Sequence, residues 1–252
     1  MSAEPVTETT TAEPRFAPRA LQAVPEAPAE ARILPAEALY GRLLATAAQH
    51  SLGDGPPHEG ALRRADGRLD PLPLDRWLGP VDDADNEILE RVERGPVLDI
   101  GCGPGRHVAA LRAAGRASLG LDLSPVAVLI TRGRGADAVL GSVFEDVPEA
   151  GRWGTALLLD GNIGIGGAPG ALLMRARELL APGGAVLVEL DPPGTRTGRT
   201  RVRLEAPGVV SEWFAWAHVA ADGVEAVAAD AGLEAAWTLN AGERWFAALR
   251  RP

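Results

Sequence analysis

Several residue types are scarce in this chain, and each shortage excludes a class of function. Lysine is absent, and all 25 basic residues are arginine, which excludes Schiff-base chemistry and the lysine of a phosphate-binding P-loop. The single cysteine, Cys102, excludes an internal disulfide and a cysteine-rich zinc site. No apolar run approaches the roughly 20 residues that span a bilayer, and no basic and then hydrophobic leader is present. We therefore expect a cytoplasmic protein with no membrane partner and no metal.

The charge balance argues against a nucleic-acid partner. The formal net charge is −9, whereas affinity for nucleic acids depends mainly on cations that neutralise phosphates. One local basic patch is formed by Arg196, Arg199, Arg201 and Arg203. A solvated loop edge explains this patch better than an RNA-binding face, because the chain as a whole is acidic.

Composition divides the chain into a tail and one domain. Residues 1–32 are rich in proline, alanine, glutamate and threonine, which predicts a disordered tail. The rest of the chain is long and apolar enough to bury one large core. A helix with one apolar side is expected from Pro35, and residues 51–76 have the composition of a loop.

A glycine-rich turn between a strand and a helix is the most informative motif. Residues 97–100 have the pattern of a buried parallel strand. Gly101, Gly103 and Gly105 follow, and they allow the backbone to turn sharply and to approach a ligand closely. A helical pattern begins near Arg106, so free backbone N–H groups and the helix dipole favour an anionic group at this turn.

The spacing of these glycines separates two classes of enzyme. Dinucleotide enzymes use G-x-G-x-x-G, whereas this chain has G-x-G-x-G, with Asp99 inside the preceding strand. Residues 119–123 predict a second strand that carries Asp122 near its end. Together these features resemble the class I S-adenosylmethionine-dependent methyltransferases, and the resemblance covers about residues 77–250.

The rest of the pattern agrees with this resemblance. Strand and helix patterns alternate after the motif, which predicts a parallel α/β sheet. Two further strands are expected at 201–205 and 209–219, and Asp222 is expected to cap the helix that follows them. The resemblance implies a doubly wound, mostly parallel, seven-stranded Rossmann-like sheet with its last strand antiparallel. An inserted β-hairpin lid and an N-terminal helical extension complete the expected fold.

This fold predicts one methyltransferase domain over residues 33–252. Its expected parts are an N-terminal helical lid region at 33–94, a cofactor-binding core at 95–192, and a hairpin insertion with the C-terminal strands at 193–252.

The resemblance implies S-adenosylmethionine as the cofactor and S-adenosylhomocysteine as the product. Asp122 matches the family's acidic residue that accepts hydrogen bonds from both ribose hydroxyls, and Leu123 would pack on the adenine. Ser142 stands where the family often has an acidic residue, so contact with the base would be less specific. The expected cofactor-binding residues are Asp99, Gly101, Cys102, Gly103, Gly105, Asp122, Leu123, Ser142, Val143 and Asp160. Cys102 is expected to be a small loop residue and not a nucleophile, and His107 a surface or capping residue.

The acceptor side is expected after the fourth strand and on the hairpin. Asp160 and Asn162 occupy the position that faces the transferred methyl group in the resembling family. Asp160 and His218 are the candidate catalytic residues, since an imidazole can act as a base near neutral pH. The candidate substrate-binding residues are Tyr40, Asn162, Trp213 and Trp216. Ordinary packing of the hairpin explains the aromatic residues equally well, and explains His218 somewhat better.

These assignments predict methyl transfer to a small molecule, such as those of specialised metabolism, by in-line displacement. The chain lacks the Asn/Asp-Pro-Pro-Tyr/Phe motif of DNA and protein-glutamine methyltransferases after its fourth strand, which favours a small acceptor. Two alternatives remain open: an NAD(P)-dependent reductase with an atypical glycine loop, and a non-catalytic S-adenosylmethionine-binding regulatory module. The sequence does not indicate an oligomeric state.

Truncation tests the predicted tail and lid. Deleting residues 1–32 is expected to leave the melting temperature and cofactor affinity unchanged, because this composition buries too little apolar surface to offset ordering. Deleting through Ser51 also removes the Leu39, Leu43 and Leu44 stripe, which is expected to cover the cleft, and should impair acceptor turnover. Thermal melts and turnover assays of both truncations check this. Parental turnover by the longer truncation would contradict a role for this helix in a lid.

Overall fold

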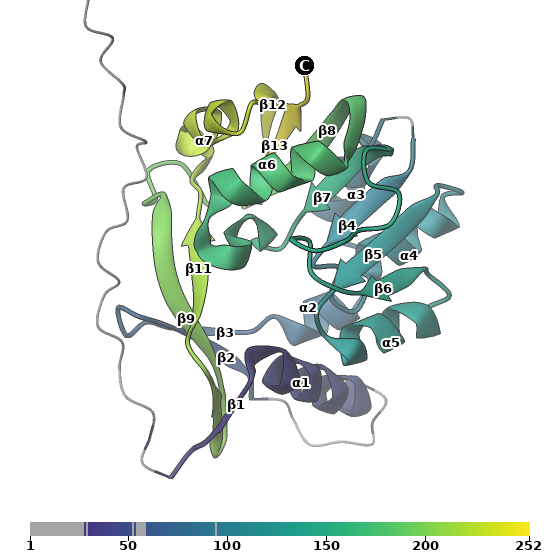
Figure 1. The fold of residues 1–252 in the computed structure, drawn as a ribbon. Helices are drawn as coiled ribbons and strands as arrows, with labels where there is room; N and C mark the ends of the chain where they lie inside the picture. Colours follow the sequence, from purple (N-terminus) through teal and green to yellow (C-terminus); the bar gives the residue numbers. More distant parts are fainter. Residues whose placement is uncertain (1–27, 29, 52, 54–58, 94) are drawn as a thin grey trace, which may run out of the picture.

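The protein contains two β-sheets, one of seven strands and one of six (Figure 1). The computed structural model describes residues 28, 30–51, 53, 59–93 and 95–252. Nearly all of the predicted tail at 1–32 therefore lies outside the described residues, although Arg32 already begins a strand. Among the described residues, no helix has the length and apolarity needed to cross a bilayer.

The seven-stranded sheet confirms the expected Rossmann-like topology. Its strand order is β12-β13-β8-β7-β4-β5-β6. Only β13 runs antiparallel to both of its neighbours, and β4 to β8 are parallel. The strands are β4 (Val97–Ile100), β5 (Ser118–Asp122), β6 (Ala138–Leu140), β7 (Trp153–Leu158), β8 (Leu180–Leu190), β12 (Glu234–Ala241) and β13 (Arg244–Arg250).

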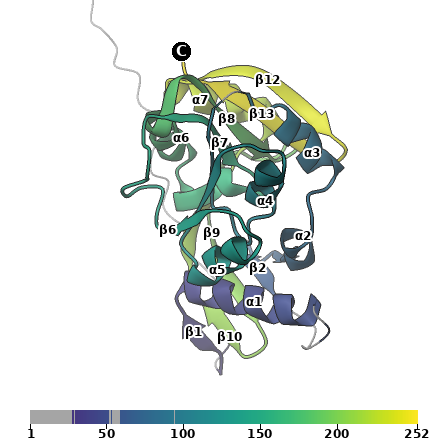
Figure 2. The same ribbon diagram turned by 90° about the vertical axis from the view of Figure 1, so that its right-hand side faces the viewer.

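Helices cover both faces of this sheet (Figure 2). The helices are α3 (Asp83–Glu90), α4 (Arg106–Ala113), α5 (Pro125–Gly133), α6 (Pro169–Leu179) and α7 (Val224–Asp230). The α6 and α7 side chains share one buried apolar cluster, and those of α3 and α4 share another. Asp82 caps α3 and the Ser124 hydroxyl caps α5.

The predicted cap of α7 is wrong. This helix begins after Gly223 without a side-chain cap. The Asp222 carboxylate instead accepts a hydrogen bond from the Gly194 backbone N–H at 2.9 Å. The 3-10 turn at Ala221–Gly223 directs Asp222 toward the preceding loop, so its side chain is unavailable to α7.

The six-stranded sheet was only partly predictable. It has the order β1-β10-β9-β2-β3, and β11 also pairs with β9. Its strands are β1 (Arg32–Leu34), β2 (Ala61–Arg64), β3 (Leu69–Pro71), β9 (Gly198–Ala206), β10 (Val209–Ser211) and β11 (Phe214–His218). The expected hairpin is therefore extended by N-terminal strands into a full sheet. The expected loop at 51–76 is wrong, since it contains β2, β3 and the short helix α2 (Leu74–Leu78).

The expected strand at 209–219 is broken in two by a bulge. Val210 pairs with Glu205 and Phe214 pairs with Val202, so this strand has one residue more than β9 between the two pairs. The Ser211 hydroxyl accepts a hydrogen bond from the Leu204 N–H there, at 2.9 Å. Below the bulge, β11 continues along β9.

Helix α1 (Ala36–Ser51) links the two sheets, as Figure 1 shows at the lower edge of the molecule. Its buried residues belong to one apolar cluster with Leu204 of β9 and Ala127 of α5. The predicted stripe is confirmed, because Leu39, Leu43 and Leu44 are all buried. The helix therefore fills the space between the six-stranded sheet and α5.

Candidate functional site

A cavity of about 860 Å³ lies where the two sheets meet. The carboxyl ends of β4, β5, β7 and β8 form one side, and β2, β3, β9 and β11 contribute to the other. Strand order reverses between β4 and β7, and ligands of open α/β sheets bind outside such a reversal. The volume is at the upper end of the range for small-molecule sites.

The three glycines after β4 serve two purposes. All have a positive φ, between +54° and +78°. A Cβ at Gly101 or Gly105 would lie 2.7 Å from Asn162 Nδ2 or 2.4 Å from Thr131, so these two glycines permit close packing of the loop. A Cβ at Gly103 would lie 3.0 Å from the Tyr40 hydroxyl. The absence of a side chain at Gly103 thus leaves space in the cavity next to the Tyr40 hydroxyl. Tyr40 also lines the cavity.

Asp122 lies at the end of β5, with one carboxylate oxygen at the glycine loop and the other at the start of α5. Oδ2 accepts a hydrogen bond from the Gly103 N–H and Oδ1 from the Ser124 N–H, both at 2.8 Å. Burial raises the pKa of Asp122, while these N–H groups oppose the rise. Each oxygen keeps a further lone pair for a ligand donor.

Three further predicted cofactor residues lie beside Asp122 in the cavity lining: Leu123, Ser142 and Val143. The Ser142 hydroxyl accepts from the Phe144 N–H at 3.2 Å. Leu123 is exposed and Val143 is buried, so the cavity offers apolar surface on both sides of Ser142.

Asp99, Cys102 and His107 surround the base of the loop. Asp99 is buried and is not among the described residues that line the cavity; its Oδ2 lies 3.7 Å from His107 Nδ1. Cys102 lines the cavity, and burial raises its pKa, which disfavours the reactive thiolate. The expectation that His107 is a surface or capping residue is wrong. It is 4% exposed, because its ring fills the space between Asp99 and Asp85.

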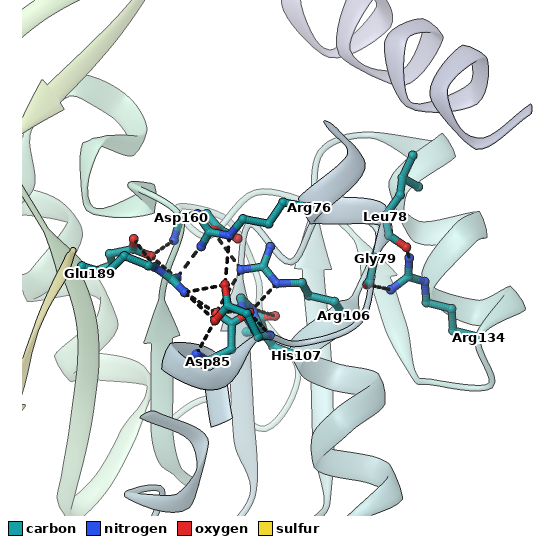
Figure 3. A network of polar contacts seen from close by, with 12 residues as sticks. Arg76, Leu78, Gly79, Asp85, Arg106, His107, Arg134, Asp160 and Glu189 are labelled. Atoms are coloured by element: carbon teal, nitrogen blue, oxygen red, sulfur yellow. Dashed lines mark hydrogen bonds and ion pairs between the residues drawn. The ribbon is translucent and has the colours of Figure 1, made fainter. Parts of the chain in front are cut away.

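A buried network of ion pairs centred on Asp85 lies beside the cavity (Figure 3). Asp85, which has no exposed surface, accepts from Arg106 Nε at 2.9 Å, His107 Nε2 at 3.2 Å and Arg244 Nη1 at 2.7 Å. Arg244 also binds Glu189, and thereby ties β13 to β8. Burial would raise the pKa of Asp85, but the hydrogen bonds from His107 and Arg106 hold it well below its usual range.

The sequence did not predict that Asp85 and Arg244 form this network. The one available signal is the capping box of α3, in which the Asp85 carboxylate accepts from the Asp82 N–H. That role alone does not reveal that Asp85 is buried or that it meets an arginine from β13.

Arg106 and Asp160 connect the network to the cavity, which both line. Asp160 Oδ1 accepts from Arg76 Nη2 at 2.8 Å and from Arg106 Nη2 at 3.0 Å. Arg106 is 4% exposed, and its Nη1 has no hydrogen-bond partner among the described residues. A buried guanidinium donor without a partner is costly, so this atom marks a place for an anionic ligand group.

Asn162 has a different position from the one expected of a substrate-binding residue. It lines the cavity, but its Nδ2 donates to the carbonyl oxygens of Ile100 and Gly101, both at 2.9 Å. Asn162 thereby holds the end of β4 against the segment that follows β7. This contact also explains why no Cβ fits at Gly101.

Aromatic residues of β11 form the opposite wall. Phe214 and Trp216 meet edge to face, with ring centroids 6.1 Å apart, and both line the cavity. Trp213 lies outside the cavity lining, and the Arg203 guanidinium lies over its ring at 4.9 Å. Adjacent residues of an extended chain point to opposite faces, which separates Trp213 from Phe214.

Close packing explains Gly164 and Gly167 in the segment after β7. A Cβ at Gly164 would lie 2.4 Å from both Trp216 Nε1 and the Ala217 carbonyl oxygen. A Cβ at Gly167 would lie 2.8 Å from that of Ala215. The 3-10 segment η1 (Asn162–Gly167) therefore lets β11 lie directly against the seven-stranded sheet's carboxyl edge.

His218 is held between two charged groups in the cavity lining. Its Nδ1 lies 3.1 Å from Asp191 Oδ2, and its Nε2 lies 2.8 Å from Arg64 Nη1. A guanidinium only donates hydrogen bonds, so Nε2 must accept and Nδ1 must carry the hydrogen toward Asp191. Arg64 in turn donates from Nε to Asp70 at 2.6 Å. Arg64, Asp70 and Asp191 were not identified from the sequence, since nothing local to them indicates a site.

The chain matches no family model and no curated protein sequence. It is similar to the structure of an S-adenosylmethionine-dependent methyltransferase from Bacteroides fragilis in complex with S-adenosylhomocysteine. That match has 24% identity and a TM-score of 0.70, and it covers 87% of this chain and 98% of the other. It is also similar to the 1,6-didemethyltoxoflavin-N1-methyltransferase of Burkholderia thailandensis, with 16% identity, 90% and 93% coverage and a TM-score of 0.54.

A third similar structure is the CcbJ methyltransferase of Streptomyces caelestis, with 19% identity, 69% and 91% coverage and a TM-score of 0.53. These likenesses show that the chain has the class I methyltransferase fold, which confirms the resemblance read from the glycine motif and Asp122.

The pH dependence of stability tests the network. Burial disfavours the His107 imidazolium, but contacts with Asp85 and Asp99 raise the pKa of His107 to about 9. A raised pKa means that this stabilisation is complete below about pH 6.5 and is lost as pH rises toward 9, a change of about 3 kcal/mol. Urea unfolding between pH 6 and pH 9.5 should therefore show a falling free energy for the parent chain.

The His107→Gln variant is expected to be less stable below pH 7 and to lack this decline. His50→Gln, at an exposed position near the end of α1, is the matched control and should keep the parental slope. Parallel curves for His107→Gln and the parent would show that His107 is not charged in the folded protein.

Proposed function

We propose that this protein is an S-adenosylmethionine-dependent methyltransferase that acts on a small-molecule acceptor. One observation carries the proposal: a single cavity joins the glycine loop and Asp122 to the aromatic wall of β11. The fold supports it, and the Bacteroides fragilis and Burkholderia thailandensis structures both contain S-adenosylhomocysteine. The cavity has room for a cofactor and a second small molecule side by side.

The residues at the glycine loop fit this cofactor. Asp122 has lone pairs for the ribose hydroxyls, and Leu123, Ser142 and Val143 can surround the adenine. The unpaired Nη1 of Arg106 suits the carboxylate of the methionine part, with Gly103 beneath it. When bound, S-adenosylmethionine supplies a sulfonium methyl group for in-line displacement.

The residues of the six-stranded sheet would hold the acceptor. Phe214 and Trp216 offer apolar surface, and together with Tyr40 they would keep water from the reacting atoms. Alignment of acceptor and methyl group within such an enclosure supplies much of the rate in a displacement.

Of the two candidate bases, His218 is better placed than Asp160. Asp160 Oδ1 is already paired with two guanidinium groups, which suits a residue that positions Arg76 and Arg106. His218 has its Nδ1 oriented by Asp191 and its Nε2 in the accepting form.

The alternatives are less well supported. A nicotinamide-dependent reductase would require the dinucleotide glycine spacing, which this loop lacks. A regulatory module has no need of an enclosed second compartment lined by aromatic residues and an oriented histidine.

Ligand binding tests the cofactor assignment. Calorimetry should show binding of S-adenosylhomocysteine and none of NADPH. Asp122→Ala should lower the affinity about 10- to 100-fold, since charge-assisted hydrogen bonds contribute roughly 1.5–3 kcal/mol. Asp137→Ala, on the exposed surface at the start of β6, should bind like the parent. Unchanged affinity of Asp122→Ala, or preference for NADPH, would contradict the proposal.

A truncated ligand isolates the role of Arg106. 5′-Methylthioadenosine lacks the amino-acid part, so Arg106→Lys should weaken S-adenosylhomocysteine binding at least about tenfold while leaving 5′-methylthioadenosine within about twofold. Arg134→Lys is the control, because Arg134 binds the carbonyl oxygens of Leu78 and Gly79 and not the cavity. Equal losses of affinity for both ligands in Arg106→Lys would contradict the assignment of Arg106 to the carboxylate of the ligand.

A further inference from the structure

A row of charged and polar side chains runs from the end of β8 across the cavity wall formed by β11, β2 and β3. The row runs from Asp191 through His218, Arg64 and Asp70 to Arg68, and each member contacts the next. All five residues line the cavity. We call them the polar row. Nothing in the cofactor assignment uses these residues.

Backbone pairing fixes the Asp191 end of the polar row. The Asp191 N–H donates to the Val219 carbonyl at 2.9 Å, and the Ala221 N–H donates to the Asp191 carbonyl at 3.0 Å. Both partners lie within three residues of His218, so the end of β8 and the end of β11 are held together. The Asp191–His218 contact is therefore built into the junction of the two sheets.

Arg64 donates a hydrogen bond to His218 Nε2, the nitrogen that would act as the base. His218 Nε2 accepts from Arg64 Nη1 at 2.8 Å, and Asp70 fixes the other side of the same guanidinium at 2.6 Å. A protonated His218 would place two cationic N–H groups against each other, so protonation of Nε2 requires Arg64 to turn away. An anionic partner in the cavity would stabilise the turned Arg64.

We propose that the acceptor is a small planar molecule with an acidic O–H or N–H, that His218 Nε2 removes this proton, and that Arg64 pairs with the resulting anion. This inference rests on the proposed methyltransferase function. The edge-to-face rings of Phe214 and Trp216 favour a flat acceptor. An acidic O–H or N–H fits this arrangement, because full transfer of its proton to an imidazole leaves an anion that Arg64 can stabilise.

The step balances in atoms and charge. The acceptor's proton moves to His218 Nε2, and the imidazolium is stabilised by Asp191 at Nδ1. The acceptor's electron pair then forms the bond to the methyl carbon, and the pair of the broken carbon–sulfur bond stays on sulfur. The proton leaves to water, and Arg64 returns to Nε2 when the neutral methylated product departs. An amine acceptor would instead yield a cation beside Arg64 and Arg68.

Phenols with coloured anions provide the test. The full chain is saturated with S-adenosylhomocysteine and titrated with 4-nitrophenol and 7-hydroxycoumarin, and with the methyl ether of each. At least one phenol should bind about tenfold or more tightly than its ether, and the bound phenolate should form about one pH unit below the free one, as expected beside a cation. Absorbance measures the phenolate, and calorimetry measures the affinity.

Variants separate the two roles. Arg64→Gln should abolish the lowered phenol pKa, and Arg199→Gln, which changes an exposed arginine outside the cavity lining, should retain it. In the parent, His218 takes up the phenol proton, so the binding enthalpy should not depend on the buffer. In His218→Gln, phenolate binding should release about one proton to the buffer.

Three results would overturn the inference: ethers that bind as well as the phenols, no phenol binding at all, or a lowered phenol pKa that survives in Arg64→Gln. Each can occur while S-adenosylhomocysteine still binds, which would leave the proposed function intact. Failure of S-adenosylhomocysteine itself to bind would instead overturn the proposed function.

Discussion

The Asp85 carboxylate is the interaction on which the site depends. It is fully buried at the first turn of α3, and it gathers cations from the start of α4 and from β13. Breaking a buried ionic cluster by removing one partner leaves the other charges uncompensated, which is far more costly than loss of a surface pair. Through Arg106 this cluster reaches the cavity, so the orientation of an unpaired donor is set by residues that no ligand touches.

A second constraint joins the two sheets. Gly164 and Gly167 allow β11 to approach η1 more closely than any side chain would permit. Trp216 therefore packs directly against the segment that follows β7, and His218 contacts Asp191 at the end of β8. The cavity wall formed by β11 is thus attached directly to the edge of the seven-stranded sheet that carries the glycine loop.

The sequence predicts the side of the cavity at the glycine loop much better than the side formed by the six-stranded sheet. The glycine loop, Asp122 and the caps of α3 and α5 depend on residues close to each other in the chain, so their local patterns are informative. Strands β2 and β3 are short and rich in charge, and they form because β9, about 140 residues further on, pairs with β2, which in turn pairs with β3. Such pairing leaves no periodic signal. The alternation of the aromatic residues does not reveal which of them line the cavity: Phe214 and Trp216 do, and Trp213 does not.

The proposed acceptor site likewise depends on geometry and not on a sequence motif. Arg64, Asp191 and His218 come from three distant segments, and none has a distinctive neighbour in the sequence. The direction of their hydrogen bonds is informative. Arg64 can only donate, so His218 Nε2 must accept and the hydrogen of His218 lies on Nδ1, toward Asp191. One planar guanidinium serves Asp70 and His218 through different nitrogens, which a lysine ammonium cannot reproduce with the same spacing. In a chain whose basic residues are all arginine, this planar group lets a single cation contact Asp70 and His218 at the same time, as the proposed role of Arg64 requires.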